Sequence, residues 1–221
     1  TSIITSSARL GKWNESISLL NEITTKHGIK PDRVIYTAVI KACSDSGRWR
    51  EAILMLAKMK ETGVPLDSAA CNSAITACAV MAKWEAALKV FNFMKQESLE
   101  IDHYTYSALI SAYDRGDQEH LIKDLYHEIM EITTNIKGAD DETRNKFAAP
   151  LNTIIKYYAR VGETASKGVE VYQRMIALEI ARNEISYTTL ITSLAKEKKH
   201  KLVVDLFKQV QKEIECDLIF L

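Results

Sequence analysis

Residues 33–67 read RVIYTAVIKACSDSGRWREAILMLAKMKETGVPLD, and residues 68–102 read SAACNSAITACAVMAKWEAALKVFNFMKQESLEID. The two stretches are adjacent, have the same length of 35 residues, and align without a gap. The matched positions include Tyr36 with Cys71, Cys43 with Cys78, Trp49 with Trp84, Met59 with Met94, and Asp67 with Asp102. A fixed period between about 20 and 50 residues is typical of solenoids, in which one structural unit is stacked repeatedly. The period therefore predicts a repeat array and not a single closed core.

Each unit contains two apolar patterns with helical spacing. In the first unit, residues 36–46 place Val39, Ile40 and Cys43 on one face, and a glycine follows at the end of this helix. Residues 49–62 repeat apolar side chains at the i, i+3, i+4, i+7 spacing of an amphipathic helix. A hairpin of two such short helices cannot bury its apolar faces without neighbours on both sides. We therefore predict an all-α chain of stacked helical hairpins.

The composition is that of an ordinary folded protein, and the net charge of the chain does not indicate a charged partner such as nucleic acid. The chain has 221 residues, of which 47% are hydrophobic, and its formal net charge is zero. No apolar run is long enough to span a membrane. The four cysteines lack the spacing of a zinc site, so we interpret them as free thiols that suit a reducing compartment. No targeting segment is visible, and we expect the chain to be part of something longer.

The repeat pattern extends through the rest of the chain. Trp13 precedes Trp49 at nearly the same spacing and marks a partial repeat at the start. A polar and charged stretch at 131–146 interrupts the pattern, and we interpret it as an insertion in or after a second helix. The predicted units are 1–32 (partial), 33–67, 68–102, 103–147 (with the insertion), 148–183 and 184–217, and residues 218–221 begin a further unit.

The repeated residues resemble a known family. The segments VIYTAVIKACSDSGRWREAILMLAKMKETGVPLD, HYTYSALISAYDRGD, LNTIIKYYARVG and ISYTTLITSLAKEKK are similar to the pentatricopeptide repeat. Its pattern runs close to V-x-T-Y-x-x-L-I, then a glycine, then A-x-x-x-F-x-x-M, then G-x-x-P-D. The resemblance covers the chain except for residues 131–146. It implies a right-handed α-solenoid of helix-turn-helix repeats whose first helices hold single-stranded RNA, with one base per repeat.

The resemblance also implies which side chains read each base. One reader follows the motif tyrosine, and the other is the last residue of the repeat. The first reader positions hold Thr1, Thr37, Asn72, Ser107, Asn152 and Thr188, and the last-residue positions hold Asp32, Asp67, Asp102, Asn183 and Asp217. Because Asp and Asn directly before a helix also cap it, helix capping and base reading are both open for the last-residue positions.

The family's code converts these pairs into a sequence preference. Thr with Asp favours G, Asn with Asp favours U, and Asn with Asn favours a pyrimidine. The implied readout is G-G-U-x-pyrimidine-G, where x is the Ser107 repeat, whose last residue is displaced by the insertion. The second residue of each repeat is implied to pack against base faces. These stacking positions hold Val34, Ala69, Tyr104, Ala149 and Ile185.

The charge distribution favours RNA on the first helices although the chain as a whole is neutral. The windows from each first reader to just past the following turn hold eleven Lys or Arg residues against five Asp or Glu residues. Attraction of phosphate requires such a local excess of positive charge and not a high overall charge. The candidate phosphate contacts are Lys41, Arg115, Lys156, Arg160 and Lys196.

We expect sequence-selective RNA binding that serves RNA processing, stability or translation in a mitochondrion or chloroplast, as the resemblance implies. The alternative is an architectural or protein-interaction subunit of a large ribonucleoprotein complex. A protein partner is expected to bind through the insertion at 131–146. The neutral net charge and the small stacking residues Ala69 and Ala149 favour this alternative. No catalytic motif, metal site or cofactor site is visible, and a catalytic domain outside this chain stays open.

Overall fold

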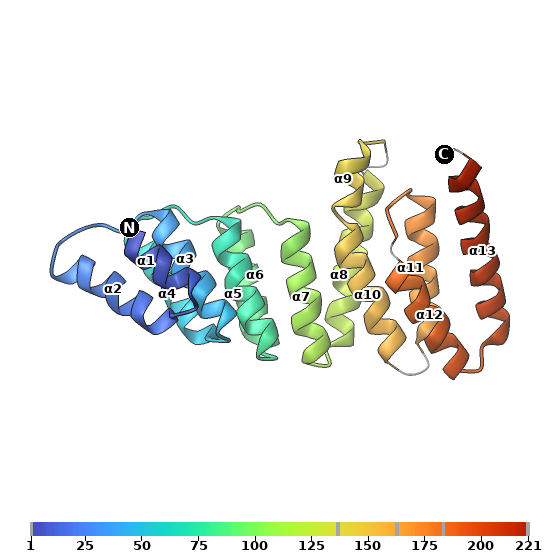
Figure 1. The fold of residues 1–221 in the computed structure, drawn as a ribbon, viewed down its shortest axis with the longest axis horizontal. Helices are drawn as coiled ribbons and strands as arrows, with labels where there is room; N and C mark the ends of the chain where they lie inside the picture. The colour runs from blue at the N-terminus through green and yellow to red at the C-terminus, as the bar shows by residue number, and fades with distance from the viewer. Residues whose placement is uncertain (1, 136–137, 162–163, 183, 220–221) are drawn as a thin grey trace. The chain divides into compact units, whose positions relative to one another are not determined.

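The computed structural model describes residues 2–135, 138–161, 164–182 and 184–219, and every regular element in these ranges is a helix (Figure 1). The helices are α1 Ser2–Arg9, α2 Trp13–Thr25, α3 Arg33–Asp45, α4 Trp49–Glu61, α5 Ser68–Val80, α6 Trp84–Gln96, α7 His103–Arg115, α8 Glu119–Asn135, α9 Asp141–Asn145, α10 Ala148–Arg160, α11 Ala165–Ala177, α12 Glu184–Lys196 and α13 His200–Ile219. The predicted all-α repeat architecture is confirmed. No helix in the described ranges is both long and apolar enough to cross a membrane.

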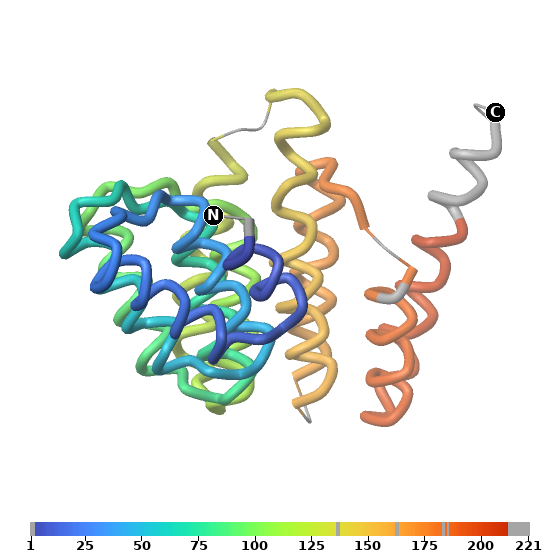
Figure 2. Tube along the Cα trace, turned by 60° about the vertical axis from the view of Figure 1, so that its left-hand side comes forward, coloured from blue at the N-terminus to red at the C-terminus, as the bar shows by residue number. Residues whose placement is uncertain are grey.

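The first of two compact units runs to Glu119 and contains the hairpins α1–α2, α3–α4 and α5–α6, followed by α7. The first helices α1, α3, α5 and α7 pack side by side, and each second helix packs against the first helix of the next hairpin. Figure 2 shows these helices in succession, coloured from blue to green. Within this unit, the second helices α4 and α6 make little direct contact with each other. The first helices therefore form the closely packed layer, on which the predicted base readers lie.

The apolar stripes read from the sequence form the core of this unit. Val39, Ile40 and Cys43 are completely buried, and so are their counterparts one repeat later. Cys43, Cys71 and Cys78 are free, as predicted, and buried. Burial raises the pKa of Cys43 to about 11 and, together with the nearby Asp67 carboxylate, the pKa of Cys71 to about 12. These thiols therefore stay protonated at neutral pH and behave as small apolar side chains.

An aspartate begins each of the three central first helices. The carboxylates of Asp32, Asp67 and Asp102 accept backbone N–H hydrogen bonds three residues further on, at 2.9, 2.8 and 2.8 Å. Such N-cap bonds satisfy a donor that the helix leaves unpaired at its first turn. The predicted helix at 36–46 consequently begins earlier, at Arg33. The apolar pattern predicted the position of the helix but not its first turn, which is polar and begins after the Asp32 cap.

Trp13 and Trp84, at the start of the second helices α2 and α6, contact the turn of the next hairpin. The ring of Trp84 lies against Gly116, where an added Cβ would be only 2.4 Å from Trp84 Cδ1. The guanidinium of Arg48 lies over the ring of Trp13, 4.7 Å from its centroid. Each contact joins one hairpin to the turn of the next, so these rings stabilise the stack.

The second compact unit begins at His120 and contains α9–α13 together with nearly all of α8. Its complete hairpins are α10–α11 and α12–α13, and α10 packs against α12. The region predicted as an insertion holds the last turn of α8, which is 17 residues long, and the short α9. Arg144 in α9 forms an ion pair with Glu179, and the carbonyl of the Asn145 side chain accepts a 2.7 Å hydrogen bond from the Ala181 N–H. These bonds tie α9 to the segment after α11.

Candidate nucleic-acid interface

Three predicted base readers lie on neighbouring first helices of the first unit. Thr37, Asn72 and Ser107 are each the fifth residue of their helix, on α3, α5 and α7 respectively. All three side chains are half-buried, so part of each is open to solvent. Because α3, α5 and α7 pack side by side, the three positions form one row.

The structure brings Asn72 and Asp102 into direct contact, although 30 residues separate them. The Asn72 amide donates from Nδ2 to Asp102 Oδ1 at 3.1 Å. Thr105 donates to Asn72 Oδ1 at 2.7 Å and lies 2.9 Å from Asp102 Oδ1. Asp102 also forms a capping box with Thr105, because its backbone N–H donates to Thr105 Oγ1 at 3.3 Å. The carboxylate thus caps α7 and contacts Asn72, the other predicted reader of the repeat 68–102.

Asp67 is arranged differently. Its Oδ1 caps α5, and its Oδ2 lies 3.6 Å from Arg33 Nε, on the first helix of the preceding hairpin. The Thr37 hydroxyl donates to the backbone carbonyl of Arg33 at 2.9 Å. With its proton used in this way, Thr37 Oγ1 offers only lone pairs to a ligand. The pair of Thr37 and Asp67 therefore presents acceptors.

The other serine and threonine readers use their protons in the same way. Ser107 donates to the carbonyl of His103, and Thr188 to that of Glu184, both at 2.9 Å. In the second unit Asn152 is buried, with 7% of its surface exposed. This makes it the least open of the described readers.

Some predicted site residues lie outside what the structure describes. They are Thr1 and Asn183 and, as regards their side chains, Ile185 and Asp217.

The second residue of each repeat is exposed wherever its side chain is described. Val34 and Tyr104 are 60% and 65% exposed, unusual for large apolar side chains, and Ala69 and Ala149 are exposed as well. The Tyr104 ring lies near that of His103, with centroids 4.1 Å apart. Exposed apolar and aromatic surface repeated at one position per hairpin fits the faces of unstacked bases.

The predicted phosphate contacts divide into two kinds. Lys41, Lys156 and Lys196 are exposed on first helices, and Arg160 is exposed as well. Arg115 instead donates from Nη1 to the carbonyls of Ala79 and Val80, at the C-terminal end of α5. Its guanidinium is thus held by the preceding first helix, and part of its function is to join two hairpins. The sequence did not indicate this contact.

Lys196 lines a small cavity of about 300 Å³ in the second unit, between α10 and α12. The remaining lining is rich in hydroxyl groups and includes the predicted reader Thr188. Those of Thr192 and Ser193 donate to backbone carbonyls, at 2.8 and 2.6 Å. Lys196 is the only positively charged residue in the lining of this cavity. Because the Thr192 and Ser193 hydroxyls use their protons on the backbone, their oxygens offer acceptors.

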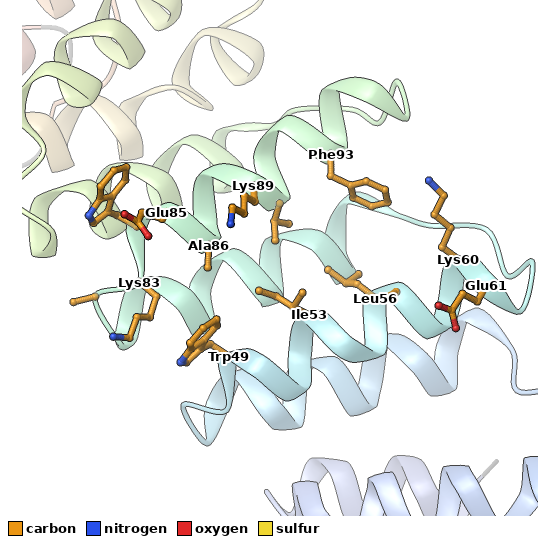
Figure 3. A pocket seen from close by; sticks show the side chains of 14 residues that line it. Trp49, Ile53, Leu56, Lys60, Glu61, Lys83, Glu85, Ala86, Lys89 and Phe93 are labelled. Carbon is orange, nitrogen blue, oxygen red and sulfur yellow. The ribbon is translucent and has the colours of Figure 1, made fainter.

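A second concavity lies on the second helices, away from the reader positions. It has a volume of about 980 Å³ and lies between α4 and α6 of the first unit. In Figure 3, Trp49, Ile53 and Leu56 of α4 line one side, and Ala86 and Phe93 of α6 line the other. The groove exists because α4 and α6 pack against α5 and not against each other. Within the described residues, no cluster of His, Cys, Asp or Glu could hold a metal ion.

Sequence reasoning missed Thr105 and Ser186, which contact the two asparagine readers Asn72 and Asn152. Both hydroxyl residues are completely buried. A polar residue at an otherwise apolar, buried position of the repeat was the available signal, because a buried hydroxyl requires a hydrogen-bond partner.

Stacked two-helix hairpins that present one polar position and one exposed position per repeat define a modular α-solenoid. The chain belongs to the pentatricopeptide repeat family. The PPR repeat family pattern matches residues 31–80 and 66–115, and the PPR repeat pattern matches residues 1–27 and 185–213, which together make up more than half of the chain. No curated protein sequence matches the chain.

Solved structures of the same family share the fold. The chain is similar to the pentatricopeptide repeat protein PPR10 of maize in complex with an 18-nt psaJ RNA element, with 19% identity and a TM-score of 0.63 over 95% of this chain and 33% of that one. It is also similar to the PPR domain of Arabidopsis thaliana protein-only RNase P 1 in complex with tRNA, with 15% identity and a TM-score of 0.62 over 79% of this chain and 86% of that domain. The chain thus spans about a third of the length of PPR10.

Proposed function

We propose that this chain binds single-stranded RNA through its first helices, with one repeat contacting one nucleotide. The contact between Asn72 Nδ2 and Asp102 Oδ1 at 3.1 Å carries the proposal. The two positions that the family resemblance assigns to one base meet in space, although 30 residues separate them. A reader built from two groups in contact offers a fixed donor–acceptor edge to one base.

Three further observations support an RNA ligand. The exposed side chains of Val34 and Tyr104 lie two residues after the N-cap of their helices, where a base could pack beside each reader. Exposed lysines such as Lys41 and Lys196 lie further along first helices and supply positive charge. Two similar structures, PPR10 and RNase P 1, contain RNA.

The proposed role is recognition and not catalysis by this chain, within the processing, stability or translation of RNA in a mitochondrion or chloroplast. Occupying a short single-stranded site is sufficient for each of these roles, because a bound array excludes nucleases or competing RNA structure from that site.

The test is the affinity of the chain for short RNAs that contain GGU, compared with RNAs of the same composition in which these nucleotides are permuted. Fluorescence anisotropy over a range of salt concentrations gives both affinity and the number of phosphate contacts. We expect tighter binding of the GGU RNA and a decrease in affinity with salt. The proposal would be contradicted by equal affinity for the GGU and permuted RNAs, by an affinity that does not change with salt, or by undetectable binding. Each of these results would favour an architectural, protein-binding role.

A further inference from the structure

Two buried hydroxyl groups contact the two asparagines that occupy first-reader positions, Asn72 and Asn152. Thr105 is completely buried and donates from Oγ1 to Asn72 Oδ1 at 2.7 Å. Ser186 is completely buried and donates from Oγ to Asn152 Oδ1, also at 2.7 Å. In both cases the hydroxyl belongs to the third residue of the first helix that follows the reader's own hairpin. The same contact thus occurs once in each compact unit.

The third position carries no hydroxyl where the preceding reader is threonine or serine. The reader and third-position pairs of this kind are Thr1 with Ile35, Thr37 with Ala70, and Ser107 with Pro150. Buried hydroxyls therefore accompany asparagine readers and are absent beside the others. A general packing requirement at this position would not produce this pairing.

We propose that Thr105 and Ser186 are positioning residues, each of which fixes the amide orientation of the asparagine reader before it and so decides which bases that repeat accepts. This inference rests on the proposed function, because it concerns the recognition of RNA bases.

The contacts around Asn72 allow only one orientation of its amide. The Asp102 carboxylate can only accept hydrogen bonds, so it must face the amide Nδ2. The Thr105 hydroxyl has one proton, and the shorter of its two acceptor distances is to Asn72 Oδ1. The amide carbonyl is thereby turned towards the buried Thr105 hydroxyl. One N–H of Nδ2 remains for a ligand.

The exposed edge of this repeat then consists of one donor and one acceptor. Asn72 supplies the remaining N–H, and Asp102 supplies Oδ2, which accepts no hydrogen bond from the described residues. Uracil matches this edge with a carbonyl oxygen and its N3–H. Guanine offers the same pair through O6 and N1–H, but its adjacent N2–H₂ donor would then have no acceptor, because the amide carbonyl faces the buried Thr105 hydroxyl.

The neighbouring repeat shows the opposite arrangement. Thr37 Oγ1 has used its proton on the Arg33 carbonyl, and Asp67 contributes a carboxylate, so this repeat presents two acceptors. Without the Thr105 hydroxyl, only Asp102 holds the Asn72 amide, so the side chain is free to rotate until Nδ2 still faces Asp102 while its carbonyl points outward beside the carboxylate, which gives two acceptors. Loss of Thr105 is therefore expected to admit guanine at the nucleotide that Asn72 and Asp102 contact.

The experiment measures the affinity of Thr105→Val for GGU RNA and for the matched GGG RNA. Valine has nearly the shape of threonine but no hydroxyl. We expect the wild type to prefer U over G at the third nucleotide by about tenfold or more, since one well-made base contact contributes about 1–3 kcal/mol to discrimination. Thr105→Val should reduce this preference to less than about threefold, and Thr105→Ser, which keeps the hydroxyl, should restore it.

The second nucleotide is the internal control, because Thr37 and Asp67 contact it and no hydroxyl at position 70 is involved. Its preference for G should be the same in all three proteins. An equal loss of affinity for every RNA, with the U-over-G ratio unchanged, would overturn the positioning role and leave Thr105 a structural residue. A wild type without any preference would instead overturn the proposed function.

Should Thr105→Val not fold, as judged by circular dichroism, Ser186→Ala provides the same test in the other compact unit. Its readout is the ratio of pyrimidine to guanine at the fifth nucleotide, which the Asn152 repeat contacts. A retained ratio in a folded Ser186→Ala protein would overturn the inference for that repeat.

Discussion

The two roles of Asp102 can be separated by two substitutions at the same position. Its Oδ1 caps α7 by accepting from the Thr105 N–H at 2.8 Å and also accepts from Asn72 Nδ2 at 3.1 Å. Asp102→Ala removes both bonds. Asp102→Asn keeps a carbonyl oxygen that can accept both, but replaces the second carboxylate oxygen with an NH₂ group. Asparagine is as good an N-cap as aspartate, whereas alanine is poor.

The expected magnitudes follow from these bonds. Loss of the N-cap costs about 1 kcal/mol, and loss of the partner of the Asn72 amide costs about another 1 kcal/mol. For a chain of this size, each 1 kcal/mol lowers the melting temperature by about 2–4 °C. We therefore expect Asp102→Ala to melt about 4–8 °C below the wild type, and Asp102→Asn to melt within about 2 °C of it.

Thermal unfolding followed by circular dichroism measures the first role, and anisotropy with GGU RNA measures the second. Both variants should lose the preference for U at the third nucleotide, because neither presents the free carboxylate oxygen. Equal destabilisation by the two substitutions would refute the capping argument. An unchanged preference for U in Asp102→Asn would refute the base-reading argument, and the two conclusions are independent.

Three further predictions concern packing, pH and salt. Gly116→Ala should destabilise the chain by about 1–3 kcal/mol in urea unfolding, because its Cβ would overlap the Trp84 ring, and combining it with Trp84→Ala should relieve that overlap. Burial raises the pKa of Cys71 to about 12, so the folded state favours the neutral thiol. The stability that this gives should be complete below pH 9 and should be lost as the pH rises from 9 towards 12. Cys71→Ala should therefore flatten this part of a plot of urea midpoint against pH. Lys41→Ala and Lys196→Ala should each reduce the salt dependence of RNA binding by about 0.7 in the log–log slope, and an unchanged slope would exclude that lysine as a phosphate contact.

The repeat period was sufficient to predict the hairpins, since it reports the requirement that each hairpin bury its apolar stripe against neighbours. The buried stripe of Val39, Ile40 and Cys43 was read directly from helical spacing. The helix start was predicted too late, because the first turn at Arg33 is polar and depends on the Asp32 cap and not on apolar residues.

Contacts between hairpins were much less accessible from the sequence. Thr105 reaches Asn72 across 33 positions, and Arg115 reaches the Val80 carbonyl across 35. Both spacings are close to one repeat, but the alignment shows only which residues are equivalent and not which side chains touch. The groove between α4 and α6 was missed for a related reason, since the spreading of second helices depends on packing geometry and not on their apolar pattern.

The central claim is that the residues at positions 72 and 102 together read one base. The most direct measurement is the affinity of the wild type and of Asn72→Thr for GGU and GGG RNAs. Asn72→Thr reproduces the pairing of Thr37 with Asp67, so the account predicts a reversal, from a preference for U to a preference for G at the third nucleotide, by about tenfold, or about 1.4 kcal/mol, in each direction. The same preference in both proteins, or no preference in either, would contradict it.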